Sequence, residues 1–211
     1  MKTSIRSARF TIGMALFLGI ILLLSISSAY YLNMLSKKTN AILKENHYSV
    51  VYAQDMAENL TKINQELINF LITNKIPDTS VLNMKFLSFK RSLELEKNNF
   101  TEPGEDKLVY SIENEYTEYR DSFVKFMQFP KPDSEVLSLQ KRFDTLYMQL
   151  ILLSQMNEKA IEEKTGDAQV SAKKATRQMT SIGTLCFLIA YGFTFIFSSY
   201  FNVRFYILYN F

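Results

Sequence analysis

The chain is poor in the residue types that most often build metal, redox and catalytic sites. Its 211 residues include one cysteine, Cys186, and one histidine, His47. A single cysteine forms no disulfide within the chain, and neither residue makes a cysteine- or histidine-based metal site by itself. Neighbouring glutamates such as Glu94 and Glu96 point to different faces of a helix, which does not favour acid–base catalysis. We therefore expect no catalytic residue, cofactor or metal, and no enzymatic activity.

Proline is also scarce, and acidic residues are missing from both ends of the chain. The four prolines, at positions 77, 103, 130 and 132, coincide with expected breaks between helices. Every Asp and Glu lies between Glu45 and Asp167. The net charge is only +3, and the middle of the chain is close to neutral. This balance argues against nucleic acid as a partner.

Two long runs without charge lie near the ends of the chain. Residues 10–32 and 180–203 are each long and apolar enough to cross a bilayer as a helix. The first run exceeds the usual length of the apolar part of a signal peptide, so we expect an anchor that is not cleaved. The sequence thus predicts two transmembrane helices in contact with membrane lipid, a basic tail over residues 1–9 and a short tail over residues 204–211.

The orientation of these spans is inferred from the short tails. Basic residues flank both faces of the membrane, so their number does not decide the topology. A short basic amino-terminal tail without acids tends to stay in the cytoplasm, and long loops cross the membrane largely regardless of charge. We therefore expect residues 33–177 on the extracytoplasmic side.

Apolar residues between the two runs recur at intervals of three and four, which indicates helices that share a core. Pro and Gly residues divide this pattern into helices over about residues 33–73, 79–98, 105–128 and 133–177. The two outer helices are about twice as long as the inner pair. The expected fold is all-α: an elongated antiparallel four-helix bundle on a two-helix stalk, flanked by two transmembrane helices.

The seam of the stalk is more polar than that of the bundle. The first outer helix places Asn46 and Ser49 on this seam. In the last helix the apolar spacing changes to four-four-four through Asn157 and Ile161, which locally unwinds a left-handed coil. Two interpretations remain open: a place where rotation or sliding is transmitted, or ordinary drift in packing.

Three arginines on different bundle helices are the best candidates for binding a small anionic ligand. These are Arg91, Arg120 and Arg142. A guanidinium group can hold a carboxylate with two parallel hydrogen bonds. The alternative is that they are surface residues paired with nearby acids such as Glu94, Asp121 and Asp144.

A resemblance to a known class of receptor rests on residues 156–188, MNEKAIEEKTGDAQVSAKKATRQMTSIGTLCFL. This stretch resembles the last extracellular helix and second membrane helix of bacterial four-helix-bundle sensor modules in histidine kinases and chemoreceptors. The amino-terminal anchor, the long first helix and the short hairpin between Leu71 and Pro132 are similar to that layout too. The resemblance covers about residues 1–200.

The resemblance implies a homodimer in a bacterial inner membrane that senses a small ligand or a periplasmic protein. Such modules pass a piston-like or rotational shift through the second membrane helix to a HAMP relay and a kinase core. No such segment follows in this sequence, so we expect a module truncated before its HAMP and output domains. The alternative is a short protein that works by pairing with a full-length receptor. The favoured function is the signal-input module of a two-component sensor histidine kinase. The alternatives are a chemoreceptor sensor region or a non-sensing membrane scaffold that acts through its helical stalk.

Overall fold

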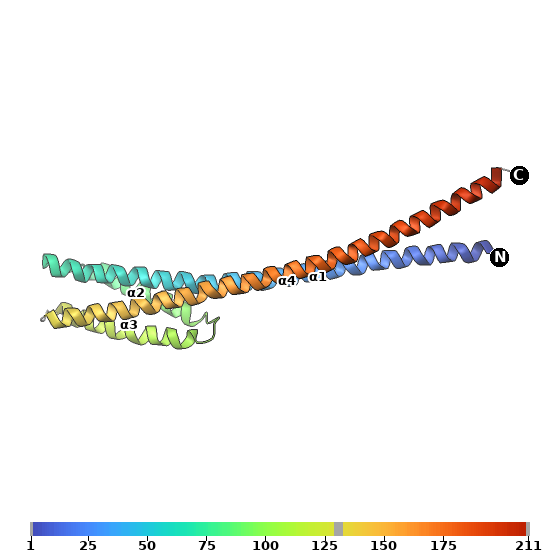
Figure 1. Cartoon of the computed structure of the whole chain (residues 1–211). Helices are drawn as coiled ribbons and strands as arrows, with labels where there is room; N and C mark the ends of the chain where they lie inside the picture. The colour runs from blue at the N-terminus through green and yellow to red at the C-terminus, as the bar shows by residue number, and fades with distance from the viewer. Residues whose placement is uncertain (1, 129–132, 210–211) are drawn as a thin grey trace. The chain divides into compact units, whose positions relative to one another are not determined.

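The computed structural model of the chain contains four α-helices and no strand in the residues that it describes (Figure 1). The helices are α1 (Lys2–Thr73), α2 (Thr79–Lys97), α3 (Glu105–Gln128) and α4 (Asp133–Tyr209). The structure describes the backbone of residues 2–128 and 133–209, and the side chains of residues 15, 17–37, 39, 44–128 and 134–192. The all-α class expected from the sequence is confirmed.

The break between α1 and α2 is built from residues that suit a turn. Asn74 takes a left-handed backbone conformation (φ 54°), and its N–H donates to the Phe70 carbonyl at 2.8 Å. Asparagine adopts this conformation more readily than most residues, and here it ends α1. The Asp78 side chain then accepts a hydrogen bond from the Ser80 N–H at 2.8 Å and caps the start of α2.

The connection between α2 and α3 is similarly well defined. The N–H groups of Asn98 and Asn99 donate to carbonyls in the last turn of α2 at 3.2 and 2.9 Å. Gly104 has φ +85°, a conformation that side chains with a Cβ rarely adopt, and α3 begins at the next residue. Glu105 and Asp106 lie in the first turn of α3, where negative charge is favourable.

The chain divides into two compact units, which we describe separately. One unit is Thr39–Thr165, and the other combines Met1–Lys38 with Gly166–Phe211. Both α1 and α4 therefore contribute residues to each unit, whereas α2 and α3 belong to Thr39–Thr165 alone.

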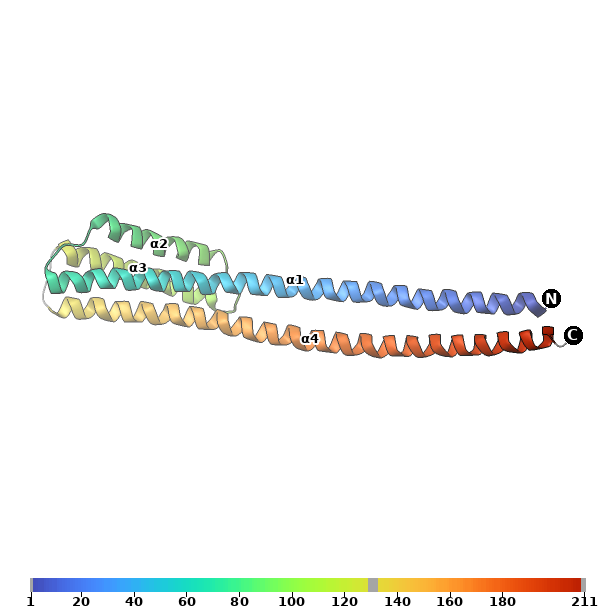
Figure 2. The same cartoon turned by 90° about the horizontal axis from the view of Figure 1, so that it is seen from above.

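The unit Thr39–Thr165 has one apolar core to which all four helices contribute, and these segments lie side by side in Figure 2. Its fully buried members recur at helical spacing of three and four on each helix. They include Met56, Leu60, Ile63 and Leu67 of α1, Phe89 and Leu93 of α2, Ile112, Tyr119 and Phe123 of α3, and Leu146, Leu150 and Leu153 of α4.

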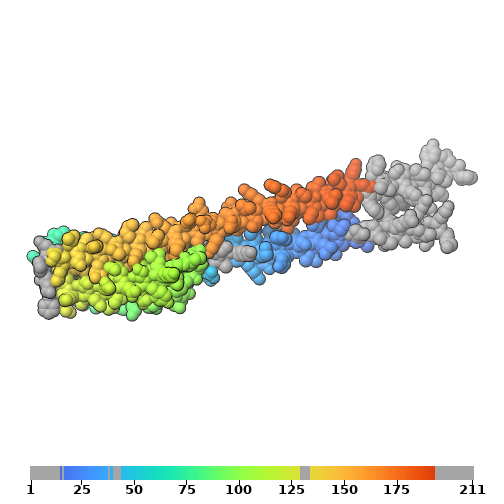
Figure 3. All heavy atoms as spheres, turned by 60° about the horizontal axis from the view of Figure 1, so that its bottom comes forward, coloured from blue at the N-terminus to red at the C-terminus, as the bar shows by residue number. Residues whose placement is uncertain are grey.

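Aromatic rings link α2 to α3 within this core. Phe89 stacks on Tyr116 with ring centroids 4.1 Å apart. The Tyr116 hydroxyl donates to the Phe86 carbonyl at 2.8 Å, and burial raises the pKa of this phenol to about 12. The α3 and α4 surfaces also meet, as the space-filling view shows, and Gln149 Nε2 donates to Ser111 Oγ across this contact at 2.9 Å (Figure 3).

The second unit holds the apolar ends of α1 and α4. Among the residues that the structure describes, one segment, Phe17–Lys37, is long and apolar enough to cross a membrane. The expected spans 10–32 and 180–203 each include side chains outside the described set, namely those of residues 10–14 and 16 and of residues 193–203. An apolar groove between the two helices is lined by residues such as Ile20, Leu24, Met179 and Ile182.

Candidate functional site

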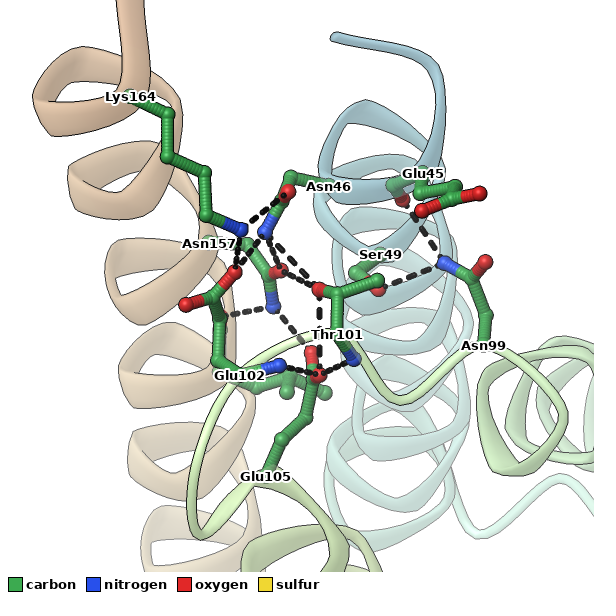
Figure 4. A network of polar contacts seen from close by, with 10 residues as sticks. Glu45, Asn46, Ser49, Asn99, Thr101, Glu102, Glu105, Asn157 and Lys164 are labelled. Atoms are coloured by element: carbon green, nitrogen blue, oxygen red, sulfur yellow. Dashed lines mark hydrogen bonds and ion pairs between the residues drawn. The ribbon is translucent and has the colours of Figure 1, made fainter. Parts of the chain in front are cut away.

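The most distinctive site is a buried group of polar side chains at one end of the apolar core (Figure 4). We call it the polar cluster. Along the sequence, its residues precede the core residues of α1 and α3 and follow those of α2 and α4, so they meet at the same end of the core. Its members are Asn46 and Ser49 of α1, Glu96 of α2, Asn99, Thr101 and Glu102 of the α2–α3 connection, Glu105 of α3, and Asn157 and Lys164 of α4.

Two asparagines join α1 to α4 across the cluster. Asn46 and Asn157 are 1% and 0% exposed, and Asn46 Nδ2 donates to Asn157 Oδ1 at 3.0 Å. The same amide nitrogen lies 2.9 Å from Thr101 Oγ1 and 2.7 Å from Glu102 Oε1. Buried amides are costly unless they are hydrogen-bonded, so this arrangement favours one register of the two helices with the connection between them.

Glu105 organises the α2–α3 connection. One carboxylate oxygen, Oε2, accepts hydrogen bonds from the backbone N–H groups of Thr101 and Glu102, the second at 2.9 Å. The other oxygen, Oε1, accepts from Asn157 Nδ2 at 2.6 Å. A fully buried carboxylate thus ties the start of α3 both to its own preceding loop and to α4.

A partly buried ion pair closes the side of the cluster that faces α4. Lys164 Nζ pairs with Glu102 and also donates to Asn46 Oδ1 at 3.2 Å. Burial alone would raise the pKa of Glu102, but its hydrogen bonds with Lys164 and Asn46 outweigh burial, so the pKa is lowered. Opposite this pair, Asn99 Nδ2 donates to Ser49 Oγ at 2.9 Å and to the Glu45 carbonyl at 2.8 Å.

Glu96 is the exception in this well-bonded group. Its side chain is 0% exposed, and neither carboxylate oxygen has a hydrogen bond of normal geometry with any residue that the structure describes. Burial raises the pKa of Glu96 to about 8, and the neighbouring negative charge of Glu105 adds to this rise. Ser49 acts in the opposite direction, because its hydroxyl favours the charged form.

The chemistry of the cluster is that of structure and proton binding. It contains no cysteine or histidine, and no group of three metal-ligating side chains occurs among the described residues. Its hydroxyl groups belong to Ser49 and Thr101, which contact asparagine and glutamate rather than a neutral base. The arrangement provides a fixed hydrogen-bond layer and one ionisable carboxyl in a dry environment.

The structure places the three candidate arginines on the surface of the same unit, and no contact joins their guanidinium groups. Arg142 pairs with Glu115 at 3.1 Å and with Glu118, both on α3. Arg120 pairs with its neighbour Asp121 at 2.9 Å. Arg91 is exposed and has no ion pair among the described side chains. Their role in binding an anionic ligand stays a prediction.

Sequence reasoning located part of the polar cluster and missed its acids. Asn46, Ser49 and Asn157 were expected on helix seams, but the contribution of the connection was not foreseen. A signal was present: the apolar stripe of α2 extended by three residues from Leu93 reaches Glu96, and the stripe of α3 extended back by four from Val109 reaches Glu105. His47, by contrast, is exposed.

Comparison with known proteins returned no match among family models, curated proteins or solved structures. Its function is therefore inferred from its own residues and geometry.

Proposed function

We propose that this chain is the signal-input module of a bacterial sensor histidine kinase, anchored in the inner membrane and acting as a homodimer without catalysis of its own. In this proposal Thr39–Thr165 is an antiparallel four-helix bundle on the extracytoplasmic side. The adjoining parts of α1 and α4 form the stalk and two membrane spans, and a HAMP relay and kinase core provide the output.

The observation that carries the proposal is the continuity of α1. This single helix of 72 residues contains both the membrane-length segment Phe17–Lys37 and the core residues from Ala53 to Phe70. A helix transmits displacement and rotation along its axis because its backbone hydrogen bonds keep it stiff. A change in the core is thereby linked covalently to an apolar segment that can cross a membrane.

The polar cluster supplies a reason for such a change to have discrete states. It lies where α1 and α4 leave the apolar core, and its hydrogen bonds join these two helices to the α2–α3 connection. Buried polar groups need partners, so a shift of one helix has to exchange one set of hydrogen bonds for another. An apolar seam would allow sliding by small steps, whereas a polar layer separates defined registers.

The stimulus in this proposal acts on the surface of Thr39–Thr165, as a small ligand or a periplasmic protein. Arg120 and Arg142 already form ion pairs with carboxylates, whereas Arg91 forms none among the described residues. It is therefore the first position to substitute when an anionic ligand is sought.

A chimeric kinase tests the proposal. Residues 1–209 are fused in frame to the HAMP relay and kinase core of a characterised sensor kinase, and autophosphorylation is measured in membranes. Asn157→Ala serves as a substitute for the unknown stimulus, because it removes the link between α4 and Glu105. Asn59→Ala is the matched control, since its amide makes only a local bond to the Asp55 carbonyl.

We expect the Asn157→Ala chimera to differ in autophosphorylation by several-fold from the unsubstituted chimera, and the Asn59→Ala chimera to match it. Equal activity of all three, at equal amounts of protein in the membrane, would argue for a scaffold whose core is not coupled to an output. Cross-linking of the same membranes tests the dimer separately.

A further inference from the structure

Glu96 differs from every other carboxyl group of the polar cluster in lacking partners. The oxygens of Glu102 and Glu105 accept hydrogen bonds from N–H groups of asparagine, lysine or the backbone. Glu96 is as inaccessible to solvent as Glu105, yet its two oxygens have no such donor among the described residues. An ionised carboxylate in this position would be dry, and only the Ser49 hydroxyl would favour its charge, which is unfavourable.

The groups around Glu96 offer it no cation. From α1 the cluster presents Asn46 and Ser49, which are uncharged. The connection presents Glu102, and α3 presents Glu105, which are acidic. From α4 the cluster presents Asn157 and Lys164, and Lys164 is paired with Glu102. The neighbouring Lys97 pairs with Glu113 and Glu94 instead.

A bound metal cation is a poorer explanation than a proton. A hard cation such as Ca²⁺ takes about six to eight oxygen ligands. Here one oxygen of Glu105 is occupied by the N–H groups of Thr101 and Glu102, and the other accepts from Asn157. Together with the remaining lone pair of Glu105 Oε1, this leaves mainly the two oxygens of Glu96 and the Ser49 hydroxyl, which are fewer oxygens than such a cation takes. A single proton neutralises the Glu96 carboxylate by forming one O–H bond.

We propose that Glu96 is a proton-binding site at the base of the α2–α3 connection, and that loss of its proton loosens this connection from the core. In the protonated state the Glu96 O–H donates toward the Glu105 carboxylate, so the two acids attract each other. On deprotonation the O–H bond breaks, the proton passes to water, and two carboxylates are left side by side. Their repulsion is relieved when the end of α2 and the start of α3 separate.

The physical environment agrees with this assignment. Burial, followed by the charge of Glu105, raises the pKa of Glu96 to about 8, so the change of state falls near neutral pH. The site depends only on the contacts within Thr39–Thr165, so it stands whether or not the chain is the input module of a kinase. In such a module, external pH would be a stimulus.

Infrared spectroscopy of the full chain in detergent tests the assignment directly. A protonated carboxyl group gives a carbonyl band distinct from that of a carboxylate, and the band is followed from about pH 6 to about pH 9, where ordinary glutamates are already ionised. Glu96→Gln has nearly the same shape and stays neutral. The matched control is Glu94→Gln, two residues away on the exposed face of α2.

We expect the unsubstituted chain and Glu94→Gln to lose one protonated-carboxyl band with a midpoint near pH 8, and Glu96→Gln to show no such loss. Hydrogen exchange of residues 98–104, corrected for the intrinsic effect of pH, is expected to accelerate at least about tenfold through the same range except in Glu96→Gln.

Three results would overturn the proposal. The first is the absence of a titrating band, and the second is an identical band in Glu96→Gln. The third is loss of the band at constant pH 6 when Ca²⁺ or Na⁺ is added, because a cation would then be the ligand. None of these results depends on coupling to a kinase, so a failure here is distinct from a failure of the chimera.

Discussion

Substitution of Asn157 by alanine removes the central amide of the polar cluster. In the folded chain Asn157 Nδ2 donates to Glu105 Oε1 at 2.6 Å, and its Oδ1 accepts from Asn46 at 3.0 Å. Asn46 keeps two other acceptors, Thr101 and Glu102, after the substitution. Glu105 Oε1 has no other hydrogen-bond donor in the described structure, so it becomes a buried, unpaired carboxylate oxygen.

The expected loss of stability follows from the hydrogen bonds that the substitution removes. A hydrogen bond to a charged group contributes about 1.5 to 3 kcal/mol, and a buried group left without its partner costs a similar amount. The loss of the amide also leaves a small void in a fully buried position. We therefore expect Asn157→Ala to lower the free energy of unfolding of Thr39–Thr165 by about 3 kcal/mol.

Denaturant unfolding of the full chain in detergent measures this difference. Near-ultraviolet circular dichroism includes the signal of the buried tyrosines Tyr116 and Tyr119, which lie in the core. Asn59→Ala is the control and is expected to stay within about 0.5 kcal/mol of the unsubstituted chain. The reasoning is refuted if Asn157→Ala is as stable as this control.

Three further predictions concern the same unit and the same unfolding measurement. Because the pKa of Glu96 is raised in the folded state, the folded chain holds this proton more tightly than the unfolded chain does. The free energy of unfolding therefore falls as pH rises from about 4.5 to about 8. The contribution of Glu96 to this fall is on the order of 5 kcal/mol and is absent in Glu96→Gln. Phe89→Ala is expected to lower the free energy of unfolding by about 3 to 5 kcal/mol, because this ring is fully buried. Leu87 lies on the same helix and is 67% exposed, so Leu87→Ala should cost less than about 1 kcal/mol. Equal costs would contradict the described core. Tyr116→Phe removes the hydrogen bond to the Phe86 carbonyl and should cost about 1 kcal/mol, and no measurable loss would show that this bond does not stabilise the core.

Local sequence patterns predicted the helices well. Intervals of three and four between apolar residues identified the buried positions, such as Leu60, Ile63 and Leu67 on α1. The last residue of α1 and both ends of α2 and α3 lie at or within one residue of the positions expected from proline, glycine and asparagine. These features depend on neighbouring residues in the chain, which is why the sequence reveals them.

The polar cluster was not predictable in the same way. Asn46 and Asn157 lie 111 residues apart, and their contact depends on how four helices align. The acids Glu96 and Glu105 fall on the apolar stripes of their helices, but a stripe does not tell whether a charged residue at its end is buried or turned to solvent. The three arginines were identified by chemistry alone, which does not tell which partners they meet. Arg120 pairs with its neighbour, Arg142 bridges α4 to α3, and Arg91 has no ion pair among the described side chains.

The central claim, that the helical core is anchored outside the cytoplasm by membrane-spanning ends, is tested most directly by cysteine labelling in intact cells. Cys186 is first replaced by serine, and Gln65, on an exposed position of α1, is replaced by cysteine. A maleimide that cannot cross the membrane is added before or after the inner membrane is permeabilised. The proposal predicts full labelling of Gln65→Cys before the inner membrane is opened. Labelling only afterwards would place the core in the cytoplasm, and recovery of the protein in the soluble fraction would contradict the anchor itself.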